Sequence, residues 1–352
     1  MTEIITVSDL TTYQYCPRKL YLLRVLKVKP ILKKEVLFGR IRHEILDLIN
    51  KEEKEIISSI TRLDKVFVEE TLRKYYSRII TQTLLREKAE IRGFNLRITD
   101  VFNNLWPSIK LMMIERRNEI YDFMLRTGFL GEELYNKIIP KTESEKKITS
   151  EKLGLKGIID LIKYYPNEII PVEYKTGSIP INGVWPSHKI QIASYIMLLM
   201  DYYNKHEYSN FREYGEGREG EEGEENKERD EGEEDKKGSD QQYQQYQQHP
   251  QFQQQLRNYQ QHNPQQGNSR VLIKQGIIKY LDFEKMNDNV NDKGSGRFIE
   301  KKITLNPFLE LKIHSLINSV RLLLEEKRIP RICKNRNKCK SCSLRKYCYE
   351  LS

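Results

Sequence analysis

Residues 156–175 read KGIIDLIKYYPNEIIPVEYK, and the predicted fold is built around this segment. Two apolar runs rich in β-branched residues flank Pro166 and Asn167, a pattern that predicts a β-hairpin with a tight turn at these two residues. Counting outward from the turn places Asp160 directly opposite Glu173, with their Cβ atoms roughly 4.5–5.5 Å apart. The hairpin therefore brings two carboxylates together.

Like charges that face each other across two strands repel, so this pair of carboxylates requires a compensating cation. Mg²⁺ or Mn²⁺ supplies that charge, because hard divalent ions prefer carboxylate ligands. Lys175 is two residues from Glu173 and shares its face of the strand, where an ammonium group can stabilise charge that develops on a phosphoryl group. The alternative is an ordinary hairpin with solvated charges on its outer face.

The pattern Gly157-x-x-Asp160 followed by Glu173-x-Lys175 resembles the RecB-type branch of the PD-(D/E)xK nucleases. That resemblance implies an α/β fold, with a mixed central sheet flanked by helices. It also implies a metal held by Asp160 and Glu173, with the Tyr174 carbonyl as a further ligand, and a catalytic role for Lys175.

Two further motifs resemble those of the same branch. Gly39-x-x-x-His43 opens a predicted helix and resembles the first RecB motif, which implies that His43 is a metal ligand; a lone histidine is otherwise an ordinary surface or core residue. Gln191 and Tyr195 are four residues apart and so share one helix face. This Gln-x-x-x-Tyr spacing implies two further active-site residues, although by chance it is common.

Five cysteines are distributed unevenly, with Cys16 alone near the N-terminus and Cys339, Cys342 and Cys348 in a C-x2-C-x5-C tail that Cys333 precedes. Without an export signal, this pattern favours metal or cluster ligation over disulfides. Zinc bound by the four tail cysteines is one interpretation, but zinc ribbons generally show two C-x-x-C pairs.

The order of all these motifs along the chain resembles the CRISPR-associated RecB-like iron–sulfur exonuclease family. The resemblance implies a 4Fe–4S cluster bound by Cys16, Cys339, Cys342 and Cys348. Cys333 either replaces Cys16 as a ligand or does not bind the cluster. It also implies trimming of single-stranded DNA ends during spacer acquisition, with CRISPR integrase proteins as partners. The cluster is expected to be structural, because hydrolysis transfers no electrons.

Composition supports a polyanionic partner. The formal net charge is +10, but residues 207–240 hold 15 acidic and 6 basic residues, so the remainder of the chain carries +19. A folded portion this basic favours nucleic acid over a membrane as the partner. The absence of a signal peptide and of long apolar runs predicts a cytoplasmic protein.

The expected organisation has six segments, with the first strand of the core at 146–153. Residues 207–269 are too polar to offset the entropy of ordering, so disorder is expected there. The segments are N-terminal helices (1–50), a helical arch (51–144), the nuclease core (145–206), a low-complexity insertion (207–269), the rest of the core with a long helix (270–330) and a cysteine-rich tail (331–352).

Two other functions fit the same residues. One is a non-catalytic iron–sulfur DNA-binding subunit, against which the intact set of Asp160, Glu173 and Lys175 argues. The other is a general DNA-repair nuclease with a zinc tail. The polarity of cleavage is not encoded in any of these motifs, and homo-oligomerisation is left open.

Overall fold

The predicted hairpin is present near the centre of the sheet. In the computed structural model, β3 (Leu155–Tyr164) and β4 (Ile169–Thr176) pair antiparallel, and Leu161 lies opposite Val172. Backbone hydrogen bonds of 2.8 and 3.4 Å close the turn at residues 165–168. This register is the predicted one, and its next opposing positions are those of the two candidate carboxylates.

The structure describes residues 4–30, 34–176, 180–205, 272–282 and 297–351. These belong to one compact unit, Met1–Tyr208 together with Val271–Ser352. The insertion expected to be disordered, residues 207–269, lies outside the described residues.

Within the described residues, the sheet has six strands: five follow the order β1-β3-β4-β5-β6, and β2 pairs along the length of β3. The β1–β3 and β4–β5 pairs are parallel and the others antiparallel, so the sheet is mixed as expected. The other strands are β1 (Ile5–Thr6), β2 (Lys141–Ser150), β5 (Gln275–Asp282) and β6 (Arg297–Thr304). β2 begins five residues before the strand predicted at 146–153, so the end of the predicted arch is part of the sheet.

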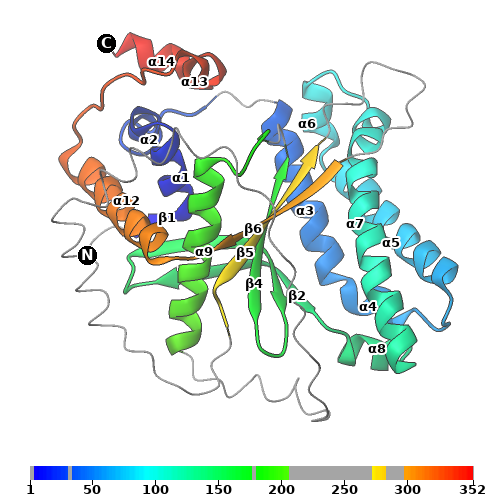
Figure 1. Ribbon diagram of the computed structural model, residues 1–352. Helices are drawn as coiled ribbons and strands as arrows, with labels where there is room; N and C mark the ends of the chain where they lie inside the picture. The colour runs from blue at the N-terminus through cyan, green and yellow to red at the C-terminus, as the bar shows by residue number, and fades with distance from the viewer. Residues whose placement is uncertain (1–3, 31–33, 177–179, 206–271, 283–296, 352) are drawn as a thin grey trace. The chain divides into compact units, whose positions relative to one another are not determined.

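One face of the sheet is covered by α9 (Pro186–Lys205), which lies across β4 and β5 and packs on α1 and α12 (Figure 1). The helices on this side and in the tail are α1 (Val7–Tyr15), α2 (Pro17–Arg24), α12 (Pro307–Glu326), α13 (Arg336–Ser341) and α14 (Arg345–Glu350). None of the helices in the described part of the chain combines the length and apolar character that a membrane span requires.

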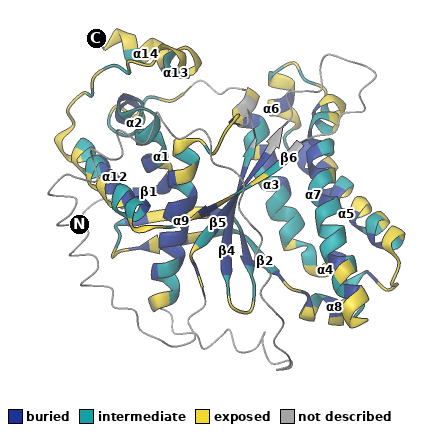
Figure 2. Ribbon diagram, in the orientation of Figure 1, coloured by how far each residue is buried: buried dark blue, intermediate teal, exposed yellow. Residues whose placement is uncertain are grey.

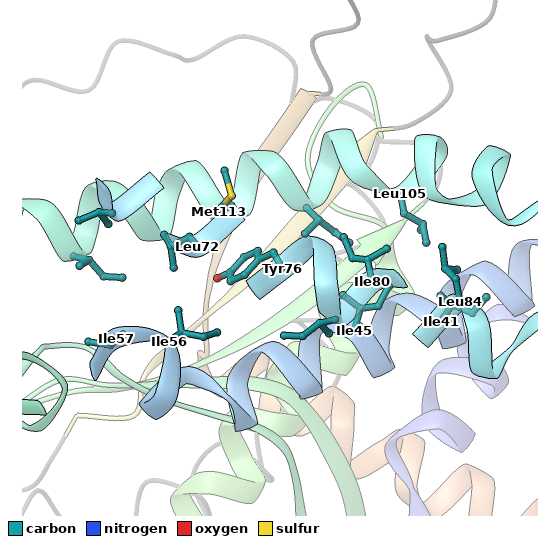
Figure 3. Packing of buried hydrophobic residues seen from close by; sticks show 14 of the residues in the cluster. Ile41, Ile45, Ile56, Ile57, Leu72, Tyr76, Ile80, Leu84, Leu105 and Met113 are labelled. Atoms are coloured by element: carbon teal, nitrogen blue, oxygen red, sulfur yellow. The ribbon is translucent and has the colours of Figure 1, made fainter. Parts of the chain in front are cut away.

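A layer of helices with its own core lies against the other face. Its members are α3 (Lys34–Lys51), α4 (Glu53–Ser58), α5 (Lys65–Arg86), α6 (Lys88–Gly93), α7 (Ile98–Thr127) and α8 (Gly131–Lys137). Figure 3 shows side chains such as Ile45, Tyr76 and Met113 packed between these helices. Figure 2 shows that the inner faces of α5 and α7 are buried, as is the centre of the sheet.

Ion pairs join this helical layer to the sheet beside the hairpin. Lys163 of β3 donates to Glu119 of α7 at 3.0 Å, and Arg116 pairs with the same glutamate at 2.8 Å. On β5, Lys279 is 2% exposed and donates to both carboxylate oxygens of Glu115 at 2.7 and 2.9 Å. Because a buried charge is costly without a partner, these pairs fix where α7 lies on the strands.

The motif glycine of β3 has a packing role. A Cβ atom at Gly157 would lie 2.9 Å from the Tyr195 ring, 3.0 Å from Val7 and 3.2 Å from Leu198. The glycine therefore allows α1 and α9 to approach the sheet closely. A Cβ atom at Gly39, the other motif glycine, would meet no heavy atom within 4 Å.

We predict opposite effects of alanine at these two glycines. Gly157→Ala should lower the free energy of unfolding by about 1–3 kcal/mol, since the added methyl group overpacks the contact between α9 and β3. Gly39→Ala, in the middle of α3, should raise it by up to about 1 kcal/mol, because alanine loses less entropy in a helix. Urea denaturation of both variants is the measurement, and equal midpoints would contradict the packing role of Gly157.

Candidate active site

Asp160 lies where the pairing of β3 with both of its neighbours is interrupted. Towards β4 the described ladder ends at Leu161 and Val172, and the Tyr174 N–H instead donates to Asp160 Oδ2 at 2.9 Å. Towards β2, Ser144 pairs with Leu161 and Lys146 with Ile159, and the position between them, Glu145 opposite Asp160, is unpaired in the ladder. The Asp160 carboxylate thus takes the place of a ladder acceptor and is held at a fixed point between the two strands.

The Glu173 carboxylate is nearly inaccessible, with 2% of the residue exposed. Its Oε1 accepts from Lys175 Nζ and from Gln191 Nε2, both at 2.7 Å. Its Oε2 is buried and has no hydrogen-bond donor among the described residues. A buried carboxylate oxygen without a partner is costly and therefore indicates a position where a cation binds.

Gln191 and Tyr195 meet as their helical spacing predicts. The Gln191 amide nitrogen donates to the Tyr195 hydroxyl at 3.0 Å as well as to Glu173, so one side chain connects the helix to the carboxylate. Tyr195 is 4% exposed, and burial raises the pKa of its hydroxyl well above the usual range. The tyrosine is therefore neutral and fixes the orientation of the amide.

His43 reaches the site from α3. Its Nδ1 is 3.5 Å from Asp160 Oδ1 and 3.5 Å from Glu145 Oε1. Potential ligand atoms of these three residues all lie within 4.8 Å of one another. Imidazole and two carboxylates are a ligand set that suits a divalent transition-metal ion such as Mn²⁺ as well as Mg²⁺ with waters.

The electrostatics of this group also indicate a missing cation. Burial raises the pKa of Asp160 well above its usual range, and the neighbouring Glu173 carboxylate raises it further. The hydrogen bond to Glu145 raises the pKa of His43 to about 9, with Asp160 and Glu173 adding to the effect. Protons on Asp160 and His43 thus balance charge that a bound divalent ion would balance in their place.

Glu145 is the residue of this group that the sequence motifs miss. It belongs to β2, outside the hairpin, and its backbone has a φ of 49°. A left-handed conformation of a non-glycine residue costs on the order of 1–3 kcal/mol and tends to occur at functional sites. Of the predicted ligands, Tyr174 is placed by its N–H bond to Asp160, while its side chain packs with Val172 and Ile277 on the face towards α3 and α7.

The five cysteines gather at a second location. All of them line one cavity between α2 and the tail, and all are free thiols. The Tyr15 hydroxyl donates to the Lys338 carbonyl at 3.0 Å, and Arg18 donates to the Cys348 carbonyl at 3.0 Å, so the N-terminal helices hold the tail in place. The cysteines are Cys16, Cys333, Cys339, Cys342 and Cys348.

Four or more thiols around one cavity are the donor set of a tetrathiolate metal centre. Burial raises the pKa of Cys16, and the neighbouring Cys333 and Cys342 raise it further. The pKa of Cys339 is raised in the same way, by burial and by the neighbouring Cys333 and Cys16. Such thiols stay protonated until a metal displaces the protons. Lys338, Lys19 and Arg345 also line the cavity and would offset the charge of bound thiolates.

Comparison with known proteins gives a family for the whole chain. The model of the PD-(D/E)XK nuclease superfamily matches residues 4–349. No match was found among curated proteins. A solved structure described as the crystal structure of SSO0001 is 16% identical and covers 74% of this chain and 77% of that chain, but its TM-score of 0.26 is too low to bear on the fold.

The chain therefore belongs to the PD-(D/E)XK nuclease superfamily. Members of this superfamily are typically metal-dependent nucleases, and the acidic cluster of His43, Glu145 and Asp160 is a candidate metal site of the kind they require.

We predict that two histidines of the metal-free protein titrate far apart. His43 should lose its proton near pH 9, and His188, whose pKa burial and the Lys175 charge lower to about 4, should stay neutral above that value. Because binding to a metal requires neutral imidazole, the affinity for Mn²⁺ should rise with pH up to about 9, by up to tenfold per unit for each proton released. NMR titration of the imidazole resonances measures both values.

Glu145→Gln provides the control, because it removes the carboxylate that raises the pKa of His43 and should lower that pKa while leaving His188 unchanged. A His43 that titrates at its ordinary value in the unsubstituted protein would show that it does not share the carboxylate cluster.

Proposed function

We propose that this protein is a metal-dependent nuclease whose active centre is formed by Asp160, Glu173 and Lys175, with His43 and Glu145 at the metal. The observation that carries the proposal is the buried Glu173 Oε2, which has no partner among the described residues and lies beside a second carboxylate. Superfamily membership supports the reaction class, phosphodiester hydrolysis.

The ligands would be carboxylate oxygens of Asp160, Glu173 and Glu145 and a nitrogen of His43. When bound, Mg²⁺ or Mn²⁺ neutralises these carboxylates, polarises the phosphate and makes water more acidic. These residues suit a divalent cation because His43, Glu145 and Asp160 offer ligand atoms within 4.8 Å of one another. Glu173 adds an Oε2 atom that has no hydrogen-bond donor among the described residues.

Lys175 acts on the substrate rather than on the metal. Its ammonium group is 2.7 Å from Glu173 Oε1 and its side chain is 23% exposed, so the same group contacts both the buried carboxylate and solvent. A cation at this position stabilises the negative charge that develops as water attacks phosphorus. Gln191, fixed by Tyr195, keeps Glu173 in the orientation that presents Oε2.

The substrate we propose is DNA, chiefly single-stranded. The charge of +19 outside residues 207–240 supports a polyanionic substrate. Resemblance to the CRISPR-associated iron–sulfur exonucleases supports trimming of DNA ends, a place in spacer acquisition and integrase proteins as partners. The helices within residues 51–144, α4–α8, would form an arch over the catalytic sheet.

We predict that Lys175→Ala separates cleavage from binding. The rate of Mn²⁺-dependent cleavage of a single-stranded oligodeoxynucleotide should fall by about 10²–10³-fold, as for loss of one charge-stabilising donor. Binding should persist and weaken with salt, since many other cations contact the phosphates. Gel-based cleavage and fluorescence anisotropy measure the two properties.

Lys156→Ala, a change at an exposed lysine of β3, is the matched control and should keep both properties. If the unsubstituted protein binds DNA but Mn²⁺, Mg²⁺ and chelator all give the same absence of cleavage, the protein is a DNA-binding subunit and the nuclease proposal fails.

We also propose a 4Fe–4S cluster at the cysteine cavity, with Cys16, Cys339, Cys342 and Cys348 as ligands. The supporting observation is that Cys16, more than 300 residues from the tail, lines the same cavity as the C-x2-C-x5-C thiols. The bound group would tie the first helices to the last, a structural rather than a redox role.

Protein purified without oxygen should then be brown and contain iron, and Cys342→Ala should remove both colour and iron. Cys333→Ala should keep both if Cys333 is a bystander. Visible absorption and metal analysis by mass spectrometry decide the matter, and a colourless protein with stoichiometric zinc would show a zinc centre instead.

A further inference from the structure

An exposed tryptophan marks the surface next to the candidate active site. Trp185 is 43% exposed and directly precedes α9. Its carbonyl accepts the N–H groups of His188 and Lys189 at 2.9 and 3.0 Å, so the backbone of this residue is fixed to the helix. Gln191 is six residues further on, about 9 Å along the helix axis. An exposed aromatic residue therefore directly precedes the helix that carries Gln191, the residue that binds Glu173.

His188 connects this position to Lys175. Its Nδ1 is 3.0 Å from the Tyr280 hydroxyl, and the two rings lie 5.6 Å apart. Tyr280 pairs with Lys175 in the β4–β5 ladder, and the Lys175 charge is near enough to lower the pKa of His188. A hydrogen bond and strand pairing thus link the start of α9, next to Trp185, to the catalytic end of β4.

Lys189, near the start of α9, has a second lysine, Lys312, as a neighbour. Lys189 is exposed. It comes four residues after Trp185, so the two residues lie on one side of the helix. Lys312 lies on α12, which packs against α9, and its pKa is lowered by burial and by the positive charge of Lys189. Within the described residues, no carboxylate pairs with either lysine. Two neighbouring cations that repel each other indicate a place where an anion binds.

We propose that Trp185, Lys189 and Lys312 form a subsite for single-stranded DNA beyond the candidate active centre, with a base stacked on the indole and phosphates bound by the two ammonium groups. The inference rests on the proposed nuclease function, because it assigns the subsite to the substrate strand. An aromatic platform flanked by cations is the arrangement that binds single strands without reading their sequence. A lone exposed tryptophan would not require a ligand, but one next to unpaired lysines has the chemistry of a nucleotide site.

The chain contains two tryptophans, which permits a direct test. The other, Trp106, is stacked on Phe102 at 5.8 Å within the helical layer. In full-length protein carrying Lys175→Ala, so that the strand stays intact, oligo(dT) should quench the fluorescence of Trp106→Phe, where only Trp185 emits. It should leave Trp185→Phe, where only Trp106 emits, unchanged. Quenching that is equal in the two variants, or absent from both, would overturn the subsite.

Affinities in the same background give a second readout. Trp185→Ala should weaken binding of oligo(dT) by about 5–150-fold, the usual effect of losing one stacked base. The double change Lys189→Met with Lys312→Met should reduce the slope of log affinity against log salt by about 1.4, because two phosphate contacts are lost. Lys137→Met with Lys152→Met, which removes two exposed lysines on other elements, should leave the slope unchanged. Equal slopes in the two double variants would contradict phosphate binding by Lys189 and Lys312.

Failure of this inference and failure of the nuclease proposal are distinguishable. If the unsubstituted protein cleaves DNA with Mn²⁺ but Trp185 is not quenched, the subsite is wrong and the nuclease stands. If Trp185 is quenched but no metal ion supports cleavage, the strand-binding surface stands and the nuclease proposal is wrong.

Discussion

Asp160 and Glu173 are two largely enclosed carboxylates whose charges repel, and the neighbouring helices and strands are arranged around this repulsion. Asp160 and Glu173 occupy the next opposing positions beyond the paired residues of one hairpin, and the Glu173 charge raises the pKa of Asp160 where little water reaches either side chain. Proteins avoid this arrangement unless a cation occupies the site, since an unpaired buried charge is far more costly than a paired one. Under the proposed function, a metal ion accounts for the pair, and the need to hold that ion accounts for the surrounding elements.

Each neighbouring element contributes one part. α9 supplies Gln191, which binds Glu173 from above the sheet, and Gly157 lets that helix approach closely enough. α3 supplies His43, and β2 supplies Glu145 through a left-handed backbone. Ion pairs between α7 and the strands hold the helical layer in register with the hairpin. Hydrogen bonds from Tyr15 and Arg18 join α1 and α2 to the cysteine-rich tail, and α1 also packs on α9.

Much of this could be predicted from the sequence, because its signals are local. A Pro-Asn turn between β-branched runs fixes the hairpin register, and four-residue spacing places Gln191 and Tyr195 together. Glu145 could not be predicted, since its position depends on a positive φ and on strand pairing across 15 residues. Likewise, no local pattern joins Cys16 to the tail, and only the resemblance indicated it. Cys333 belongs to the tail, and the sequence left its role open; in the structure it lines the same cavity as the other four cysteines.

Anomalous diffraction from crystals soaked in Mn²⁺ would show whether a metal ion binds between Asp160 and Glu173. A single strong peak within coordination distance of Asp160 and Glu173, with His43 or Glu145 as a further ligand, is the result that the two facing carboxylates predict. Mn²⁺ bound elsewhere, with both acids protonated and in direct contact with each other, would contradict it.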